Sequence, residues 1–559
     1  MKRWVPRGVA AAALVAMLAA ACTGGGSSAN PSPGGSGQKV IEGGVLRIGS
    51  ISPIDTLNPF SAFQQNSFIA FQYIYPYLVQ YDSQLNIVPD FATKWEEAPD
   101  GLTWTFHTVP GASWSDQQPL GAADAAWTIT MELKYAKGPT AAVAGDLAHV
   151  TSAEATDANT LVVHYESPVA NALSNLQQIA ILPQHVWGTY ATGNGKGLKT
   201  FANPAPIVGA GPFVLTQYKK DQIALFQSNP NWYGGQKPHI QGFGIQFFSD
   251  QDAMITALKT GQLDYVDVVP PTAVADVKKA GFVVTVTPKT GLRDFIINSN
   301  PKKPKNRELL NPLVKEAFAH AIDRQDIVKT AWLGYAAPGD SLVPPAMGHW
   351  HDPNLKPESF DLAQANQLLD QAGYPKGADG IRVANGHPMS YTVIFATDEN
   401  GAGDRAFQII QNDFRQIGVQ LTQHKLDVNA TFDAIIAPDG KYLNYDLAMW
   451  DWTVMPPDPD FILSVMTCGS WEIWNDSGYC DKSYDQLYQE QGAAVDPAKR
   501  QAIIYQMQDK LYNDRPYIIL TYDDVIDAHA TNWTGFVPSP TGSVNPYSKT
   551  TLLSVHRVS

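Results

Sequence analysis

The sequence predicts a mixed α/β fold built from more than one lobe. Short segments rich in β-branched and aromatic residues alternate with amphipathic segments that have the period of an α-helix. No repeat with a period of about 20 to 50 residues is present, which argues against solenoids and propellers. After an N-terminal leader about 520 residues remain, and at roughly 100–200 residues per domain this length predicts several domains.

The expected strands and helices follow one another along the chain. Strand-like segments are short and β-branched or aromatic, and they cover residues 45–48, 102–106, 161–165, 243–248 and 391–395. Helix-like segments place their apolar residues on one face, and they cover residues 361–373, 407–417 and 497–513. Asp361 is the expected N-cap of the first of these helices, and Gly373 ends it. Soft boundaries rich in Pro, Lys or Gly occur at residues 203–206, 301–305 and 338–348.

The N-terminus has the layout of an export signal. Three basic residues precede thirteen apolar residues, Val9 to Ala21, which run directly into Cys22. A membrane-spanning helix needs roughly 20 apolar residues, so this run predicts a cleaved signal peptide at residues 1–21. The residues before the cysteine resemble a bacterial lipobox, with Ala19 where leucine is usual, and this predicts acylation of Cys22. An ordinary secretory peptide cut at the same small residues is the alternative.

The next segment is expected to be a flexible linker that ends near Gly43. Residues 22–42 comprise the cysteine and this linker, and residues 23–38 are almost wholly Gly, Ser, Pro, Asn and Thr, which cannot bury a core. The whole chain carries a net charge of −14, and the leader contains three of its positive charges. Nucleic acid is therefore not expected as a partner.

Two cysteines remain for the folded body, Cys468 and Cys480. The turn-forming residues between them allow them to meet, and export favours a disulfide. Closing a loop of this size contributes about 3 kcal/mol in the chain-entropy model. A pair of free thiols and metal ligation are the alternatives, but no His or third Cys stands at metal-ligand spacing nearby.

The usual constellations of enzyme active sites are missing. No His-Glu-x-x-His, Cys-x-x-Cys or Gly-x-Ser-x-Gly motif occurs. Two glycine-containing segments, at residues 195–196 and 209–211, superficially resemble phosphate-binding loops but lack the defining residues, so they are interpreted as turns. His349 and His351 have no nearby third ligand for a metal ion. The sequence therefore predicts no catalytic residue, metal or cofactor.

Paired carboxylates are the remaining feature that an extracellular hydrolase would need. They occur in two places, at Asp451, Asp458 and Asp460 and at Asp523 and Asp524. A hydrolase uses such a pair as acid and base across a cleft. Solvated or capping roles are commoner for aspartates in turns, so the structural interpretation is preferred.

Three passages carry motifs in a specific order. Residues 89–106 contain PDFATKWE and DGLTWTF, and residues 208–264 contain VGAGPF, NPNWYGG and ALKTGQLD. The third passage, residues 314–374, contains VKEAF, AIDR and a terminal Gly-Tyr. Together they resemble the family 5 solute-binding proteins, the oligopeptide- and dipeptide-binding receptors of bacterial ABC importers, over about residues 44–535.

This resemblance implies a two-lobed periplasmic-binding-protein type II fold with an extra inserted subdomain, of the cluster C kind. It places lobe I at residues 44–75, 202–288 and 521–559, the inserted subdomain at residues 76–201, and lobe II at residues 289–520. The expected motion is hinge closure around a ligand, and the closed form is the one that the permease recognises.

The resemblance also suggests ligand-binding residues in lobe II. Peptide-binding members have a Trp, then an Asp that pairs with the ligand's α-amino group, then an acidic residue and Pro. Aligning Asp458-Pro459 with the acidic-Pro pair puts Met455 at the amine-binding position, and a thioether cannot pair with an ammonium. Unless Asp451 or Asp458 substitutes, a free-amine peptide loses at least about tenfold in affinity. Trp450 and Trp452, two apart in a strand, share one face, where they contact ligand or belong to the core.

Three further residues are candidates for ligand contact. Arg293 could meet a ligand carboxylate or form a structural ion pair, and Asn58 and Phe60 lie on an opening loop of lobe I. The expected protein is a monomer, lipid-anchored on the extracytoplasmic face of the cytoplasmic membrane. Its partners would be a peptide-like ligand and ABC permease subunits with cytoplasmic ATPases. Oligosaccharides such as cello-oligosaccharides, which stack on aromatic rings, are the alternative ligand, and a hydrolase or a scaffold is a more distant alternative.

Overall fold

The computed structural model describes residues 40–396, 401–436, 444–452, 457–471, 473–539, 542–545 and 547–559. Cys22 and Met455 lie outside the described residues. The expectations for the lipid anchor and for the amine-binding position therefore stay predictions. The chain from Val40 to Ser559 forms one contact unit, and its architecture is α/β.

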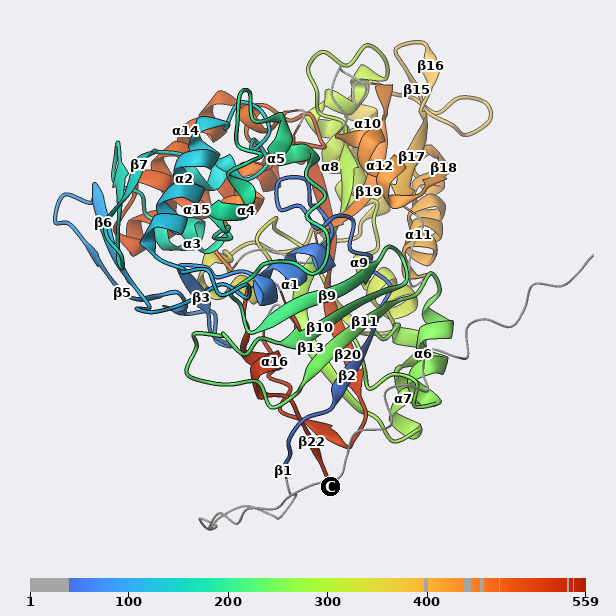
Figure 1. Ribbon diagram of the computed structural model, residues 1–559. Coiled ribbons are helices and arrows are strands. Elements are labelled where there is room, and N and C mark those ends of the chain that lie inside the picture. Colours follow the sequence, from blue (N-terminus) through green and yellow to red (C-terminus); the bar gives the residue numbers. More distant parts are fainter. Residues whose placement is uncertain are drawn as a thin grey trace, which may run out of the picture. The chain divides into compact units, whose positions relative to one another are not determined.

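Among the described residues, eleven strands form a central mixed sheet (Figure 1). Its order is β18 (Gln420–Leu426), β17 (Ser390–Ala396), β19 (Leu447–Trp452), β13 (Val283–Ile297), β20 (Tyr517–His529), β12 (Tyr265–Val266), β2 (Val45–Ser50), β11 (Gly242–Phe247), β10 (Ile223–Ser228) and β9 (Phe213–Lys219), with β14 (Ala336–Pro338) paired to β20. Pairing is parallel for β2 with β11 and for β17 with β18 and β19, and antiparallel for β13 with β20.

The two longest strands connect the two ends of this sheet. β13 and β20 pair from Val283 opposite His529 to Ile296 opposite Tyr517. At one end β20 also pairs with β12. At the other end β13 pairs with β19, beginning at Leu292. β13 and β20 therefore belong to both halves of the sheet, which is the arrangement expected where a chain crosses between lobes.

A second sheet of four strands lies within residues 92–165. Its order is β5 (Ala92–Glu97), β6 (Thr103–Thr108), β8 (Thr160–Tyr165) and β7 (Val150–Asp157). Every second residue of β6 and β8 is buried, including Trp104, Phe106, Leu161 and Val163. Helix α2 (Ala122–Lys134) covers β7 and β8. This sheet falls inside the segment expected to be an inserted subdomain.

The other elements are helices and short strands. The helices are α1 (Gln65–Ile74), α3 (Ala172–Gln177), α4 (Gln184–Trp187), α5 (Lys196–Thr200), α6 (Gln251–Lys259), α7 (Val274–Lys279), α8 (Pro312–His320), α9 (Arg324–Asp326), α10 (Leu362–Gln371), α11 (Ala402–Gln416), α12 (Val428–Ile435), α13 (Asp460–Ser464), α14 (Lys482–Ala493), α15 (Pro497–Asp514) and α16 (Thr550–Ser554). Short 3-10 helices are η2 (Ala144–Leu147), η3 (Pro271–Ala273), η4 (Arg307–Leu310), η6 (Pro345–Trp350) and η8 (Cys468–Ser470), and η5 (Ile327–Ala331) is a π-helix. The short strands are β1 (Val40–Ile41), β3 (Val79–Tyr81), β4 (Ile87–Pro89), β15 (Val383–Ala384), β16 (His387–Pro388), β21 (Trp533–Thr534) and β22 (His556–Val558).

The first and last strands of the described chain pair with each other. Val40 lies opposite Val558 and Ile41 opposite Arg557 in an antiparallel ladder. β22 also pairs with β21, so the three strands form a small sheet of their own. The point where the described chain begins is thereby fixed beside its C-terminus.

The predicted elements are present. The five predicted strands correspond to β2, β6, β8, β11 and β17, and the three predicted helices to α10, α11 and α15. The carboxylate of Asp361 accepts a hydrogen bond from the amide of Gln364, as an N-cap does. Gly373 follows α10 with a φ of 84°, the left-handed conformation that glycine adopts readily.

The glycine segment at residues 209–211 is a close-packing feature. A Cβ atom at Gly209 would lie 2.3 Å from the carbonyl oxygen of Ile74, and one at Gly211 would lie 2.3 Å from that of Tyr73. The amide of Gly211 donates to the carbonyl of Ile74 over 2.8 Å. This segment therefore packs against the end of α1, which confirms its interpretation as structural. No helix of the described chain combines the length and the apolar character needed to span a bilayer.

Candidate ligand-binding site

The end of β19 runs beyond its pairing with β17 and is partly buried. β17 pairs with β19 only at residues 447–449, whereas β13 pairs with β19 along residues 447–452. Among the described residues, Trp450, Asp451 and Trp452 are therefore paired with β13 but lie beyond the ladder between β17 and β19, which ends at Met449. Such a strand end can accept an extended peptide as an added strand.

The two faces of this strand end differ in character. Trp450 lies opposite Asp294 and Trp452 opposite Leu292, so the two indoles share a face with those β13 residues. Asp451 lies opposite Arg293 and points to the other face. The first face therefore carries both tryptophans of the strand end, and the other carries the ion pair of Asp451 with Arg293.

Six aromatic side chains gather on the first face, and we call them the aromatic cluster. Ring centroids of neighbouring members lie 5.6–6.4 Å apart. They come from five segments of the chain and are Phe63, Phe432, Trp450, Trp452, Phe461 and Trp474. Only the two tryptophans of β19 are predicted from the sequence, because no local pattern connects the other four.

Phe63 joins the aromatic cluster from the segment before α1. Its ring stacks on Phe432 of α12 at 5.9 Å and is 40% exposed. Asp55 holds the loop in place, because its carboxylate accepts hydrogen bonds from the amides of Phe63 and Gln64 and from the hydroxyl of Ser67. Phe63 is thus presented by a preorganised loop, and its contact links residues from the two predicted lobes.

Arg293 lies on the second face between two carboxylates. Its Nε donates to Asp523 Oδ2 over 2.7 Å, and its Nη1 lies 3.1 Å from Asp451 Oδ2. The guanidinium also lies over the ring of Trp332, 4.7 Å from its centroid. Burial raises the pKa of Asp523 to about 6, and Arg293 opposes that rise. Of the two roles considered for Arg293, the structure shows the structural ion pair, and at neutral pH this group of three charges is net negative.

Asp458 does not face a ligand. Its two carboxylate oxygens accept from Nη1 and Nη2 of Arg500, both over 2.7 Å, in a bidentate pair. Arg500 is 4% exposed and also donates to Gln491 and lies over Trp350. The predicted ligand contact of Asp458 is corrected to a structural role, because both of its oxygens are committed to a buried guanidinium.

Asn58 and Phe60 also occupy structural positions. Asn58 is 2% exposed, and its amide nitrogen donates to the carbonyls of Leu198 and Phe201 over 2.7 Å. Phe60 is equally buried and meets Trp187 edge-to-face. Their predicted contact with ligand is therefore replaced by packing against α4 and α5. Phe63, three residues beyond Phe60, is the aromatic residue that this segment exposes.

The remaining predicted groups have structural partners as well. Cys468 and Cys480 form a disulfide, with their Cα atoms 4.6 Å apart. His351 Nδ1 lies 2.8 Å from the carbonyl oxygen of Val343, and His349 packs on Trp350. No three His, Cys, Asp or Glu side chains of the described chain are grouped to hold a metal ion.

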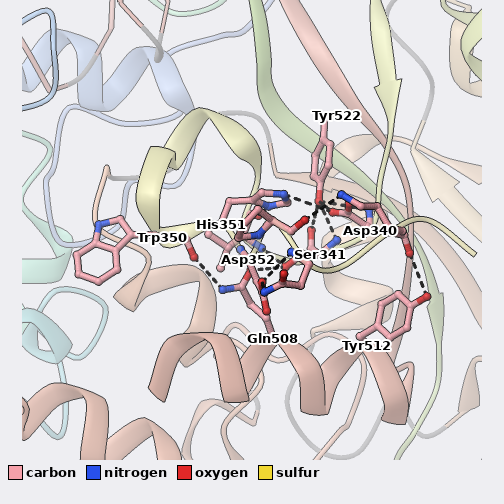
Figure 2. Close-up of polar contacts among 12 residues, drawn as sticks. Asp340, Ser341, Trp350, His351, Asp352, Gln508, Tyr512 and Tyr522 are labelled. Atoms are coloured by element: carbon pink, nitrogen blue, oxygen red, sulfur yellow. Dashed lines mark hydrogen bonds and ion pairs between the residues drawn. The ribbon is translucent and has the colours of Figure 1, made fainter. Parts of the chain in front are cut away.

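Tyr522 of β20 belongs to a polar network with Asp340, Ser341 and Gln508 (Figure 2). Its hydroxyl accepts from the amide of Ser341 over 2.7 Å and lies 2.7 Å from Asp340 Oδ1. Gln508 of α15 accepts from Ser341 Oγ and donates to the carbonyl of Trp350. The adjoining cavity measures about 20 Å³, room for about one water molecule, so this network ties α15 to β20 and holds no solute.

Two buried aspartates, Asp294 and Asp476, lie close enough for the charge of one to affect the other. Asp294 is fully buried, and its two carboxylate oxygens have no hydrogen-bond partner within the described residues. Asp476 is also buried, and its carboxylate accepts from the hydroxyl of Tyr517. Burial and the neighbouring Asp476 raise the pKa of Asp294 well above its ordinary value, and burial raises the pKa of Asp476 to about 7.

Comparison with protein families identifies the chain. The model of the bacterial extracellular solute-binding proteins, family 5 Middle, matches residues 86–472. The chain belongs to this family. As a family 5 protein it is an extracellular solute-binding protein and not an enzyme.

Related proteins of known sequence or structure resemble the family 5 protein along most of its length. The glutathione-binding protein GsiB of Shigella boydii is 22% identical over 501 residues, which cover 88% of this chain and 91% of GsiB. The structure of the periplasmic binding protein DppA from Helicobacter pylori in complex with the peptide STSA has a TM-score of 0.78 at 23% identity, covering 93% of this chain and 99% of DppA. NikZ from Campylobacter jejuni in complex with Ni(L-His) has a TM-score of 0.80 at 22% identity, covering 92% and 99%. These similarities confirm the predicted two-lobed fold.

Proposed function

We propose that this family 5 protein captures peptide-like solutes between its two lobes and delivers them to an ABC permease. In this proposal the lobes have the predicted boundaries, with lobe I at residues 44–75, 202–288 and 521–559, an inserted subdomain at residues 76–201 and lobe II at residues 289–520. Hinge closure takes place where β13 and β20 cross between the lobes. The contact of Phe63 with Phe432 is the kind of contact that closure makes.

The end of β19 beyond its ladder with β17 is the observation that carries this proposal. A peptide main chain that lies along Trp450 to Trp452 can form strand-like hydrogen bonds with β19 where its ladder with β17 has ended. Main-chain bonds of this kind give affinity for peptides of many sequences. Two relatives support the same class of ligand. GsiB is named a glutathione-binding protein, and the structure of DppA contains the peptide STSA.

An oligosaccharide is the second candidate ligand. The aromatic cluster favours it, since sugar rings stack on flat aromatic faces, and Trp450 and Trp452 are only partly buried. A sugar, however, has no main chain to pair with this end of β19. At the same site, a peptide would therefore pair with the main chain of β19, and an oligosaccharide would stack on the aromatic cluster.

Native mass spectrometry of the purified protein tests the proposal through the mass of any co-purified ligand. Thermal-shift assays with a random tripeptide and tetrapeptide mixture and with a cello-oligosaccharide series follow. Stabilisation by the peptides alone is expected, because bound ligand raises the melting temperature by mass action. Stabilisation by the sugars alone would establish the alternative, and no shift from either would contradict both.

We also propose that Cys22 is acylated after cleavage of residues 1–21, and that residues 22–42 tether the lobes to the membrane beside the permease and its ATPases. A tether keeps the receptor at high local concentration near its transporter. Intact-mass analysis of protein from the membrane fraction is expected to show a diacylglyceryl-modified N-terminal cysteine. A mature N-terminus without lipid would contradict the anchor and leave the binding proposal intact.

A further inference from the structure

We propose that the ligand is a peptide in which aromatic and basic side chains alternate. This inference rests on the proposed function, because it assumes that a peptide strand adds to β19 beyond its ladder with β17. Successive side chains of an added strand point to opposite faces, as they do in β19 itself. One set of ligand side chains therefore meets the aromatic cluster, and the other set meets the face that carries Asp451.

The aromatic face suits an aromatic ligand side chain. Trp450 and Trp452 are partly buried, and Phe63 keeps 40% of its surface exposed at the rim of the aromatic cluster. Ile473, beside Trp474, is 45% exposed as well. Burying a Phe-sized side chain here is worth about 1.5–3 kcal/mol, and edge-to-face or offset contacts with the surrounding rings add to it.

The opposite face suits a cation. Arg293 is held by Asp451 and by Asp523, so two carboxylates surround one guanidinium. A ligand carboxylate would add a third negative charge to this group and would compete for an arginine already paired. Asp451 is 36% exposed and contributes its Oδ2 to the pair with Arg293. A ligand ammonium or guanidinium beside Asp451 balances the charge.

The second arginine of this region supports the same conclusion. Arg500 is bound bidentately by Asp458 and is 4% exposed, so it offers nothing to a ligand carboxylate. Asp451 and Trp452 are neighbours on one strand. The ligand positions that prefer a basic and an aromatic side chain are therefore adjacent in the peptide. The selectivity is therefore for an alternating pattern and not for composition alone.

Calorimetric titration of four C-terminally amidated tetrapeptides tests the inference. They are Lys-Phe-Lys-Phe, Glu-Phe-Glu-Phe, Lys-Ala-Lys-Ala and the rearranged Lys-Lys-Phe-Phe. Lys-Phe-Lys-Phe is expected to bind at least about fivefold more tightly than the Glu peptide, from the charge at Asp451, and at least about tenfold more tightly than the Ala peptide, from ring burial. The rearranged peptide, with the same composition, is expected to bind at least about fivefold more weakly.

Two variants separate the faces. Asp451→Asn is expected to abolish the preference for Lys over Glu and to keep the preference for Phe over Ala, and Phe432→Leu is expected to do the reverse. Asp433→Asn, an exposed neighbour on α12, and Phe360→Leu, at a 41% exposed ring outside the aromatic cluster, are the matched controls. They should change neither preference.

The possible outcomes distinguish the two proposals. If wild-type protein binds the peptide mixture but binds the Lys and Glu peptides, or the alternating and rearranged peptides, equally well, this inference is wrong and the proposed function stands. If no peptide of the mixture or of the four binds, the proposed function itself fails. The comparison of peptides on wild-type protein decides the matter even where a variant folds poorly.

Discussion

Replacement of Asp458 by alanine is expected to lower the free energy of unfolding by about 3–5 kcal/mol, because Arg500 would remain buried without its counter-charge. The two side chains are 10% and 4% exposed and are joined by two bonds of 2.7 Å. Denaturant unfolding followed by tryptophan fluorescence measures this loss. Asp433→Ala, which removes an exposed carboxylate, should change the free energy of unfolding by no more than about 0.5 kcal/mol.

A double variant sharpens this experiment. Asp458→Leu combined with Arg500→Met removes both charges, and apolar replacement of a buried pair is often neutral. The double variant is therefore expected to be more stable than Asp458→Ala. If Asp458→Ala instead kept full stability and lost peptide affinity, the structural role assigned to Asp458 would be wrong and its ligand role would return.

Stability is expected to fall by a few kcal/mol between pH 5 and pH 8 because of the buried pair Asp294 and Asp476. The pKa of Asp476 rises to about 7 in the fold, and that of Asp294 is also raised, whereas ordinary aspartates titrate near 3.8. The folded state therefore holds these protons more tightly than the unfolded state. Their contribution is complete below about pH 4 and is lost as the pH rises through 7, at about 1.4 kcal/mol for each tenfold change in proton affinity.

Asp294→Asn isolates this effect. The substitution keeps the shape of the side chain and removes the charge that Asp476 would otherwise face, so unfolding free energies at pH 5 and pH 8 should converge. Asp523 and Asp527, whose pKa values rise to about 6 through burial, act in the same direction and remain in the variant. An unchanged difference between pH 5 and pH 8 in Asp294→Asn would show that other carboxyls cause the pH dependence.

The fold was largely predictable because its signals are local. Periodicity alone identifies α10, α11 and α15, and the cap at Asp361 and the turn at Gly373 give the ends of α10. The strands on each side of the crossing are equally visible as short apolar segments. Register and sheet order are less accessible, since a ladder such as that of β13 with β20 joins residues more than 200 positions apart.

The candidate site was only partly predictable for the same reason. Trp450, Asp451 and Trp452 are consecutive in the sequence, so the alternation of their side chains between the two faces of a strand can be predicted. Nothing in the sequence brings Phe63 to Phe432, and nothing local shows that Asp458 has Arg500 as its partner. Family resemblance suggested a ligand role for Asp458, and the structure replaces it with an ion pair because the partner comes from a distant helix.

The pairing of β1 with β22 has a practical consequence for measurement. Val40 and Val558 are register partners, so a linker attached after Ser559 would leave the body at the corner where the proposed N-terminal tether enters it. Immobilising the protein on a sensor surface through its C-terminus therefore imitates the orientation that the proposed tether would give.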